Sequence, residues 1–545
     1  VKAQDNQIKG VSVWYNTTCT ECDAGCGIQV RTREGRAIKI EGNSNNPINR
    51  GGVCAIGHSA LQNMYDPDRI RQPLVSKAGR TADFQAVTWD EGISKLVGRL
   101  KPKSDPKSAP KTGKVAYLGN PKSGALAGLI KDFCDESDVI YVPYNTVSNA
   151  AEAKASELAF GTAGIPTYDL EKADVILNFG TDFLETWISP CEYARGWSDA
   201  RRKKKPCRVV HVEPRLSLTG ANADTWLMAN PGSEIRLALA VLKLLVERGK
   251  GSGLSDEVMA KIRRLTSSVT LDGVVKQTGI AKDRILVVAE HLFEAKHSLV
   301  LAGGASASTE SPLPLMVAAN FINLVLGNVG STVNIAAVRQ ATGGDLKAVQ
   351  DLIAKMKKGE IETLIVDGSN PLFNLPPSFE FGYGIKKVQM IVSLASHIDE
   401  TTHEAHLILP TSTGLESWGD VDSTDGIYGL IQPVMKPVFD TKGHGDLLIE
   451  ISRKAGKDGV ARGHDTFLNL LKERWQGIHT KSGSGKLFNT FWLESVEQGG
   501  YFKDRSKADP VSVRVQDAAF SFNFDVANFG DDKSTDEAVS YTHLR

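Results

Sequence analysis

The sequence has no run of eighteen apolar residues, so it encodes no segment long enough to cross a membrane as a helix. It also has no excess charge of either sign. Its 64 Lys and Arg balance 64 Asp and Glu, which leaves no basic footprint for nucleic acid. Cysteine is scarce, with seven in 545 residues, and this excludes the small disulfide-rich class of secreted domains. The length predicts about three or four domains of ordinary globular composition.

The chain also lacks an initiating Met and an N-terminal signal sequence, and we expect a processed or partial chain. At the other end, Val539 to Arg545 reads VSYTHLR, which we interpret as a non-native read-through tail. The natural protein would then continue past about residue 538. The alternative is a genuine polar tail, because the residues from Asp531 to Glu537 are polar as well.

Four of the seven cysteines lie close together near the N-terminus, as Cys19-x2-Cys22-x3-Cys26 followed by Cys54. Thiolates at this spacing form disulfides or bind metal, and four cysteines are the usual ligand set of a [4Fe–4S] cluster. Structural zinc sites usually pair two short arms of two cysteines each, and disulfide frameworks are expected in small chains without a core. The division into three cysteines plus one favours the cluster, with zinc and disulfides as alternatives.

The residues around these cysteines predict a hairpin, a loop and a short helix that surround the metal site. The segment from Ile28 to Ile40 alternates as a hairpin and turns at Glu34-Gly35. Residues 42–52 are loop formers, whose backbone N–H groups can bond to cluster sulfurs and tune the potential. A short helix is expected from Ala60 to Met64.

The rest of the chain predicts an α/β fold. After an exposed linker at 101–114, short apolar strands alternate with helices, which predicts parallel sheets covered on both faces. The expected strands are 115–118, 139–142, 173–179 and 207–212 in a first set, and 298–302, 363–366, 390–394 and 405–409 in a second. Two such sets indicate two doubly wound domains. The expected division is a cluster domain at 1–75, α/β domains at 76–230 and 231–419, and a linker or helical region at 420–538, of which 420–475 could return to pack on the first domains.

Small and polar residues follow several of these strands. Because doubly wound sheets bind ligands at the carboxyl ends of their strands, these residues are candidates for cofactor binding. They are Gly180, Asp182, Glu213, Asn370 and Pro410. Ordinary strand-to-helix turns are the alternative, since such turns are common in this fold class.

The cysteine motif has further residues around it that carry a family resemblance. Together with Gly35-Arg36, Gly42-Asn43, Arg50-Gly51 and the segment from Tyr65 to Ile70, it resembles the opening domain of the molybdopterin oxidoreductase (dimethyl sulfoxide reductase) superfamily. Other motifs are most similar to one branch, the molybdopterin-like iron–sulfur subunits of quinol-oxidising membrane complexes such as alternative complex III. They lie at 179–187, 323–330, 399–410 and 415–420.

Two positions depart from the catalytic members of this superfamily. The resemblance places the molybdenum ligand in the window from Tyr144 to Ala151, where Ser148 is the one candidate. Catalytic relatives also carry Lys or Arg in a Cys-x-[Lys/Arg]-Gly motif, where this chain has Ile56. Ile56 cannot hydrogen-bond or stabilise charge, so a relay from cluster to pterin is in doubt.

The resemblance therefore implies an iron–sulfur electron-transfer subunit without molybdenum, with Cys19, Cys22, Cys26 and Cys54 as cluster ligands. Expected partners are a membrane quinol-binding subunit, a further iron–sulfur domain or subunit and a cytochrome c subunit. The expected location is periplasmic, on the outer face of the cytoplasmic membrane. The alternative is a catalytic enzyme of the dimethyl sulfoxide or polysulfide reductase type, with bis-molybdopterin guanine dinucleotide and Mo or W bound through Ser148. A third hypothesis is a structural body without even the cluster. Relatives end in a β-barrel domain, which we expect to be missing here.

Overall fold

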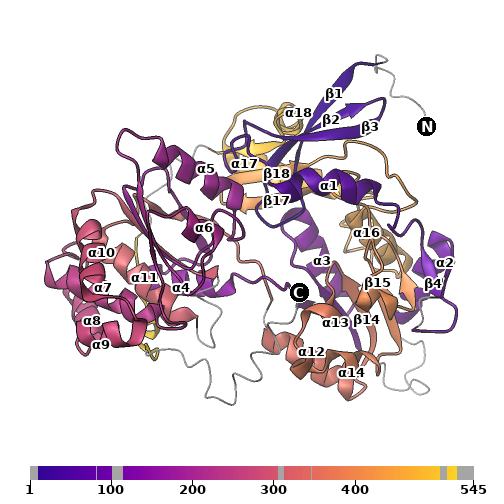
Figure 1. The fold of residues 1–545 in the computed structure, drawn as a ribbon. Coiled ribbons are helices and arrows are strands. Elements are labelled where there is room, and N and C mark those ends of the chain that lie inside the picture. Colours follow the sequence, from indigo (N-terminus) through magenta and orange to yellow (C-terminus); the bar gives the residue numbers. More distant parts are fainter. Residues whose placement is uncertain are drawn as a thin grey trace. The chain divides into compact units, whose positions relative to one another are not determined.

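The computed structural model describes residues 10–80, 83–100, 114–304, 312–344, 346–503 and 512–524 (Figure 1). The chain divides into two compact units, which are described separately. The first unit comprises residues 1–148, 342–423 and 427–503, and the second comprises 149–341, 424–426 and 504–545. The expected linker, apart from Lys114, and the tail at 539–545 lie outside the described residues.

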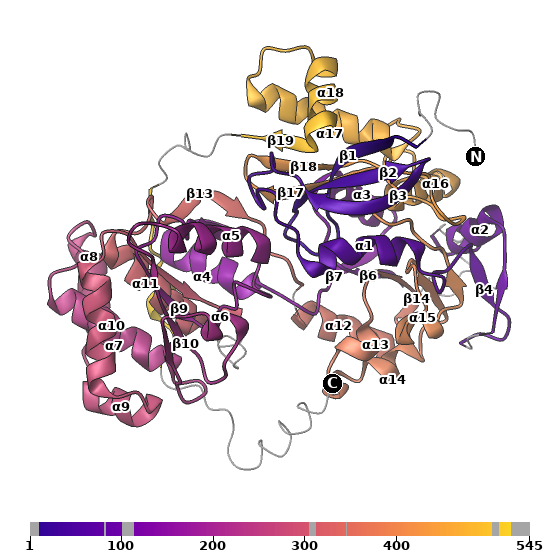
Figure 2. The ribbon, with the colours of Figure 1, turned by 45° about the horizontal axis from the view of Figure 1, so that its top comes forward.

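A small antiparallel sheet in the first unit carries the cysteine motif (Figure 2). Its strands are β1 (Ser12–Thr18), β2 (Gly27–Arg33) and β3 (Arg36–Gly42), in that order. The predicted hairpin is confirmed. Glu34 and Gly35 both have positive φ, of 51° and 77°, which is the geometry that two-residue hairpin turns favour. Helix α1 (Ala55–Tyr65) begins five residues before the predicted start, because Cys54 caps it.

The first unit also contains a seven-stranded sheet in the order β5-β4-β16-β15-β14-β6-β7. The strands from β16 to β7 are parallel, and β4 and β5 add antiparallel edge strands. They are β4 (Leu74–Ser76), β5 (Phe84–Ala86), β6 (Lys114–Gly119), β7 (Val139–Pro143), β14 (Ile361–Asp367), β15 (Met390–Ser393) and β16 (Leu407–Ile408).

Helices cover both faces of this sheet. Alternate residues of β6 enter two different cores. Val115 and Tyr117 pack on the side of α2 (Trp89–Leu100), α3 (Gly124–Glu136) and α16 (His444–Lys454). Ala116 and Leu118 pack on the side of α12 (Leu346–Lys357) and α14 (Phe381–Ile385). This period of two is what a strand buried on both faces requires, and it confirms the predicted α/β class.

The second unit is built on a parallel four-stranded sheet in the order β11-β10-β9-β12. Its strands are β9 (Val175–Phe179), β10 (Arg208–Val212), β11 (Thr225–Leu227) and β12 (Ser298–Ala302). One large core joins this sheet to its helices, mainly α4 (Ala150–Phe160), α7 (Glu234–Glu247), α10 (Lys282–Glu294) and α11 (Leu313–Leu326). Strands β8 (Ile165–Tyr168) and β13 (Val333–Arg339) form a separate antiparallel ribbon.

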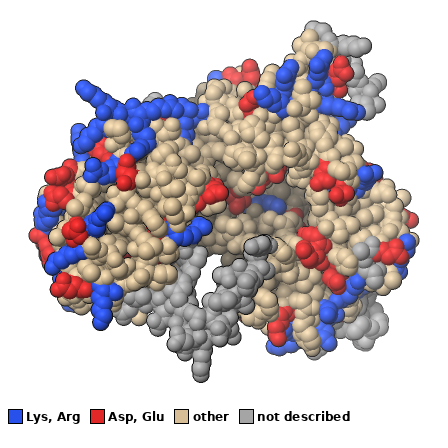
Figure 3. All heavy atoms as spheres, viewed as in Figure 1, with Lys and Arg blue, Asp and Glu red and all other residues tan. Residues whose placement is uncertain are grey.

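The remaining described helices of this unit include α5 (Pro190–Arg201), α6 (Leu218–Ala221), α8 (Asp256–Thr266) and α9 (Leu271–Thr278). Lys and Arg gather over the end of α5 on the face shown in Figure 3, where the sequence reads RRKKK from Arg201 to Lys205. Among the described helices, none has both the length and the apolar character needed to span a bilayer.

The strand pairing departs from the boundary expected at residue 230. Strand β6 pairs with the distant β14 on one side and with β7 on the other, while β9 to β12 form the sheet of the other unit. The region expected to be linker or helix also contains strands β17 (Gly419–Thr424), β18 (Ile427–Ile431) and β19 (Gly500–Phe502), besides helices α17 (Phe467–Ser482) and α18 (Phe488–Gln498). This return segment packs on β1. The hydroxyl of Thr17 accepts a bond of 3.0 Å from Gln432 N–H, and that of Thr18 donates one of 3.2 Å to the Leu430 carbonyl.

Candidate metal centre

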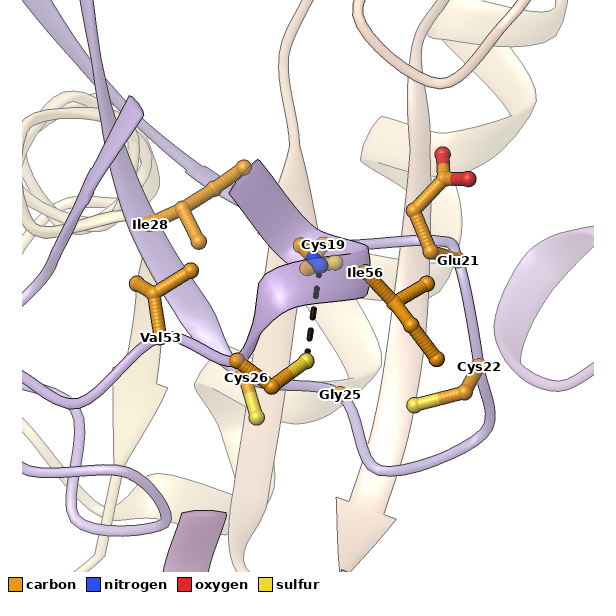
Figure 4. Close-up of a pocket in the computed structure, with 10 residues that line it drawn as sticks. Cys19, Glu21, Cys22, Gly25, Cys26, Ile28, Val53 and Ile56 are labelled. Carbon is orange, nitrogen blue, oxygen red and sulfur yellow. Dashed lines mark hydrogen bonds between the residues drawn. The ribbon is translucent and has the colours of Figure 1, made fainter. Parts of the chain in front are cut away.

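The structure brings all four predicted cysteines to one pocket of the first unit (Figure 4). The pocket has a volume of about 320 Å³, counting its open mouth. It is lined by Cys19, Glu21, Cys22, Gly25, Cys26, Ile28, Val53, Cys54, Ile56 and Gly57. Figure 4 shows the Cys22 side chain turned from its loop toward the side of the pocket where Cys26 lies.

Three of the cysteines occupy the loop that joins β1 to β2. Thr18 and Gly27 are the last paired residues of the two strands, and Cys19 N–H donates a bond of 2.8 Å to the Cys26 carbonyl. This bond closes the loop and holds Cys19 and Cys26 opposite each other. Both are buried, whereas Cys22 at the middle of the loop is exposed.

The fourth cysteine lies at the N-terminus of α1. Cys54 is the N-cap residue, and Gly57 N–H donates to its Sγ at 3.4 Å. The N-terminus of α1, which is the positive end of the helix dipole, therefore lies at Cys54 Sγ. Gly57 lines the pocket, and a Cβ at this position would lie in van der Waals contact with Cys19 Sγ at 3.7 Å and Cys54 Sγ at 3.9 Å, and only 3.0 Å from Val53 Cγ1.

Burial controls the protonation of the pocket when no metal is bound. It raises the pKa of the Cys19 thiol to about 12, although a backbone hydrogen bond at Glu21 opposes the shift. The free thiol is therefore neutral at physiological pH. Metal binding must displace this proton, since thiolate is the form that ligates.

The arrangement suits a cluster better than a single ion. Among the described residues, no three His, Cys, Asp or Glu side chains converge closely enough to hold one metal ion. A zinc ion would need its four ligands at about 2.0–2.3 Å from one centre. In a [4Fe–4S] cube each thiolate binds a different iron, so the four sulfurs surround a volume instead of meeting at a point. The four thiols, the pocket and Gly57 fit a cube.

Ile56 also lines this pocket. It lies between Cys54 and Gly57 in the sequence, and 59% of its surface is exposed. An exposed large apolar side chain beside four thiols adds no hydrogen bond and no charge to the pocket. That no relay runs from the cluster to a pterin stays a prediction from the sequence.

The other candidates of the first unit lie after strands of the seven-stranded sheet. Ser148 follows β7, and its Oγ lies so close to Gly343 that a Cβ there would approach it to 2.2 Å. Asn370 follows β14 and uses its amide oxygen to hold Thr401, accepting from the hydroxyl at 2.7 Å and from the N–H at 3.2 Å. Pro410 is buried after β16, and its carbonyl accepts a bond of 3.4 Å from Lys442 N–H.

In the second unit, Gly180, Asp182 and Glu213 lie at the carboxyl ends of β9 and β10. Asp182 Oδ1 is bonded to Thr219, accepting from its hydroxyl at 2.6 Å and from its N–H at 3.1 Å. Glu213 is fully buried, and its Oε1 accepts from Ser217 N–H at 2.5 Å. The other oxygen, Oε2, has no hydrogen-bond partner among the described residues. Asp182 is thus used within the fold, whereas Glu213 keeps one oxygen available.

The sequence analysis did not identify a buried polar cluster at the carboxyl ends of β6 and β14. Tyr117 donates to Asp367 Oδ2 at 3.0 Å and lies 3.0 Å from His444 Nε2, and Lys122 Nζ lies 3.6 Å from the same Asp367 oxygen. Burial acts to raise the pKa of Asp367, but His444 and Lys122 hold it below its usual value. The sequence did hold one indication of this cluster, because the charged Asp367 ends an apolar strand directly before the Gly368-Ser369-Asn370 turn.

Comparison with known proteins adds two family matches. The model of the molybdopterin oxidoreductase Fe4S4 domain matches residues 12–66, and that of molybdopterin oxidoreductase matches residues 69–454. The chain belongs to the molybdopterin oxidoreductase family. As a member with the Fe4S4 domain, it carries a [4Fe–4S] cluster, which confirms the cofactor prediction.

Among curated proteins, this molybdopterin oxidoreductase is 32% identical over 488 residues to the menaquinone reductase, molybdopterin-binding-like subunit, of Nitratidesulfovibrio vulgaris. The match covers 86% of this chain and 68% of that protein. It is 30% identical over 249 residues to the molybdopterin-containing subunit of the arsenate respiratory reductase of a Shewanella species, covering 44% and 28%. The predicted superfamily and type of subunit are confirmed.

Among solved structures, acetylene hydratase from Pelobacter acetylenicus matches with a TM-score of 0.75 at 13% identity. The match covers 97% of this chain and 81% of that one. At this identity the likeness concerns the fold alone, and it confirms the mixed α/β architecture.

Proposed function

We propose that this chain is the iron–sulfur electron-transfer subunit of a membrane-associated quinol:acceptor oxidoreductase, and that Cys19, Cys22, Cys26 and Cys54 ligate its cluster. The observation that carries the proposal is the pocket itself, in which four thiols meet an apolar Ile56 instead of a cation. The similarity to a menaquinone reductase subunit supports the quinone-linked role.

A bound [4Fe–4S] cluster supplies one-electron transfer, and the residues of the chain set the conditions for it. The four thiols give up their protons on binding. Gly57 N–H and the N-terminus of α1 stabilise the negative charge at Cys54. Burial of Cys19 and Cys26 limits access of water to two of the four sulfurs.

We further propose that this chain binds no molybdenum. Two features support this: Ile56 supplies no relay, and Ser148, the one ligand candidate in its window, lies directly against Gly343. The α/β body then serves as a docking scaffold. The proposed partners are a membrane quinol-binding subunit, a further iron–sulfur domain or subunit and a cytochrome c subunit, on the periplasmic side of the cytoplasmic membrane.

The alternative is a catalytic molybdopterin oxidoreductase, with Ser148 as metal ligand. A specific observation favours it, namely the buried Glu213 Oε2 that lacks a partner among the described residues. A buried carboxylate oxygen without a partner is costly unless a bound group satisfies it. Gly180 and Asp182 would then border the same ligand.

Substitution of one proposed ligand tests the assignment. In the chain purified with its native partners, Cys22→Ser should abolish the EPR signal of the reduced cluster and remove most of its iron, since a hydroxyl replaces a thiolate. Cys191→Ser is the control, because Cys191 is partly exposed and does not line the pocket. An unchanged signal and iron content in Cys22→Ser would refute the ligand set.

A further inference from the structure

Three asparagines lie at three-residue spacing in the loop that leads from β3 to Cys54. Asn43, Asn46 and Asn49 are all fully buried. Buried amide groups are generally hydrogen-bonded. Asn46 accepts from Ile48 N–H at 2.8 Å, but its Nδ2 has no hydrogen-bond partner among the described residues. The partners of Asn49 differ in kind from those of the other two.

Asn49 uses both ends of its amide to hold the backbone on either side of the pocket. Its Oδ1 accepts from Gly27 N–H at 2.9 Å, and its Nδ2 donates to the carbonyls of Gly27 and Gly52, each at 2.7 Å. Gly27 directly follows Cys26, and Gly52 lies two residues before Cys54. One side chain therefore connects the arm of three cysteines to the arm of the fourth.

The bonds to Gly27 resemble those of an additional β-strand. The N–H and the carbonyl of Gly27 both bond to the same amide group, as they would to a neighbouring backbone residue. Because two bonds join the Asn49 amide to Gly27, they fix both the position and the orientation of the Gly27 backbone. They therefore also restrict the orientation of the adjacent Cys26.

The two arms are in close contact at Gly27, where an added Cβ would lie 2.5 Å from Asn46 Cβ. The second arm is also folded tightly on itself, since a Cβ on Gly42 would lie 2.2 Å from the Gly51 carbonyl oxygen. Contacts this short leave no room for any side chain at the two glycines. The amide of Asn49 therefore bridges two segments that are already in close contact, which makes it a stiff connection.

We propose that Asn49 is a positioning residue that fixes Cys26 relative to Cys54 and thereby sets the geometry and the reduction potential of the cluster. This inference rests on the proposed ligand set. Asn49 touches no reacting atom, and it acts through the backbones of Gly27 and Gly52.

The chemistry of the amide makes the inference specific. Asn49→Ala removes all three bonds. Asn49→Asp keeps an acceptor for Gly27 N–H but replaces the amide donor by a second oxygen that faces the carbonyls of Gly27 and Gly52. The Gly27 carbonyl keeps its bond of 2.9 Å from Asn43 N–H, which does not involve the Asn49 side chain. Both variants should therefore loosen the connection, and the Asp variant does so without a loss of side-chain volume.

Asn43 provides the matched control for general destabilisation. It is equally buried in the same loop and also makes two side-chain bonds, donating to the Gln498 carbonyl at 2.7 Å and accepting from Asn45 N–H at 3.0 Å. Neither bond joins the two cysteine arms. Asn43→Ala therefore removes comparable contacts without releasing the connection.

The experiment measures cluster release to an iron chelator, the EPR line shape and the midpoint potential of the purified complex. Amide exchange at Gly27 is followed in the metal-free chain. We expect Asn49→Ala and Asn49→Asp to release iron about ten- to hundred-fold faster, with a changed line shape and potential and faster exchange at Gly27. Asn43→Ala should leave the line shape and the potential as in the wild type.

Wild-type line shape, potential and release rate in both Asn49 variants would overturn the proposal, and so would equal changes in Asn43→Ala. If Asn49→Ala does not fold, the same measurements on Asn49→Asp decide whether the proposal holds. A wrong ligand assignment would show itself in a different experiment, as unchanged iron content and EPR signal in Cys22→Ser. The exchange rate of the Gly27 amide is measured without metal and does not depend on that assignment.

Discussion

At the scale of single residues, two neighbouring positions in α1, Ile56 and Gly57, shape the wall of the pocket beside the cysteines. Gly57 donates its N–H to Cys54 Sγ and leaves free the space that a Cβ would fill near two sulfurs. Ile56 brings an exposed apolar surface to the same place. Substitutions of Gly57 and Ile56 therefore give two separate predictions.

Gly57→Ala should lower iron occupancy without destabilising the metal-free chain. The new Cβ would also lie 3.0 Å from Val53 Cγ1, which crowds the pocket wall, whereas alanine favours a helix over glycine by up to about 1 kcal/mol. Iron content and thermal unfolding of the metal-free protein measure the two effects. Gly98→Ala is the control, because Gly98 lies in α2 with open space around it. Full iron content in Gly57→Ala would contradict this account of the pocket.

Ile56→Lys should raise the reduction potential of the cluster. A cation at the pocket stabilises the reduced state, which carries one more negative charge. Because the position is more than half exposed, solvent screening limits the effect to about 1 kcal/mol, or roughly 40 mV for one electron. A potentiometric titration followed by EPR measures the shift, and Ile56→Leu serves as the uncharged control. An unchanged or lowered potential in the Lys variant would show that position 56 does not influence the cluster.

At the scale of elements, helix α1 carries Cys54 at one end and is anchored at the other by a buried ion pair. Arg69 Nη2 lies 2.9 Å from Glu416 Oε2, and both side chains are fully buried. Arg69 also donates to the carbonyl of Met64 near the end of α1, and Glu416 accepts from Val438 N–H. The pair thus ties the helix to the segment that follows β16.

Arg69→Met should lower the free energy of unfolding of the first unit by about 3–5 kcal/mol, because it leaves the Glu416 carboxylate buried without its cation. The double variant Arg69→Met/Glu416→Leu should recover much of this loss. Hydrogen exchange of α1 peptides in increasing urea is the measurement. Lys77→Met serves as control, since the exposed Lys77–Asp83 pair contributes less than about 1 kcal/mol. Equal losses of unfolding free energy in Arg69→Met and Lys77→Met would argue against a special role of the buried Arg69–Glu416 pair.

The sequence predicts local elements where pattern and turn agree. The Ile28–Ile40 hairpin follows from its alternation and the Glu34-Gly35 turn, and the strands β6, β7, β9 and β10 follow from short apolar runs. The pairing of β6 with β14 does not follow, because the period of a strand says nothing about a partner more than two hundred residues away. The β17–β18 hairpin was missed even though Asp425-Gly426 is a strong turn signal.

The candidate site shows the same limit. The spacing of the four cysteines was enough to group them, because residues that are close in sequence can lie close in space whatever the rest of the fold is. The roles of Asn49 and Gly57 depend on contacts between two loops, and no spacing rule reveals such contacts. Asp182 and Asn370 were grouped as cofactor candidates, but their side chains bond to neighbouring turns, which only the coordinates show.

At the scale of the whole molecule, the chain is a molybdopterin oxidoreductase with a mixed α/β fold of two units, the first of which carries the [4Fe–4S] domain. The proposed role uses the cluster and treats the rest of the body as a scaffold. Catalytic and electron-transferring members share this body, so the fold does not distinguish them. The distinction depends on the metal content.

Metal analysis of the chain isolated in its native complex tests this claim most directly. The account predicts about four irons bound by this chain and molybdenum and tungsten far below one per chain. Stoichiometric molybdenum or tungsten that is retained in the wild type and lost in Ser148→Ala would contradict it and establish the catalytic alternative.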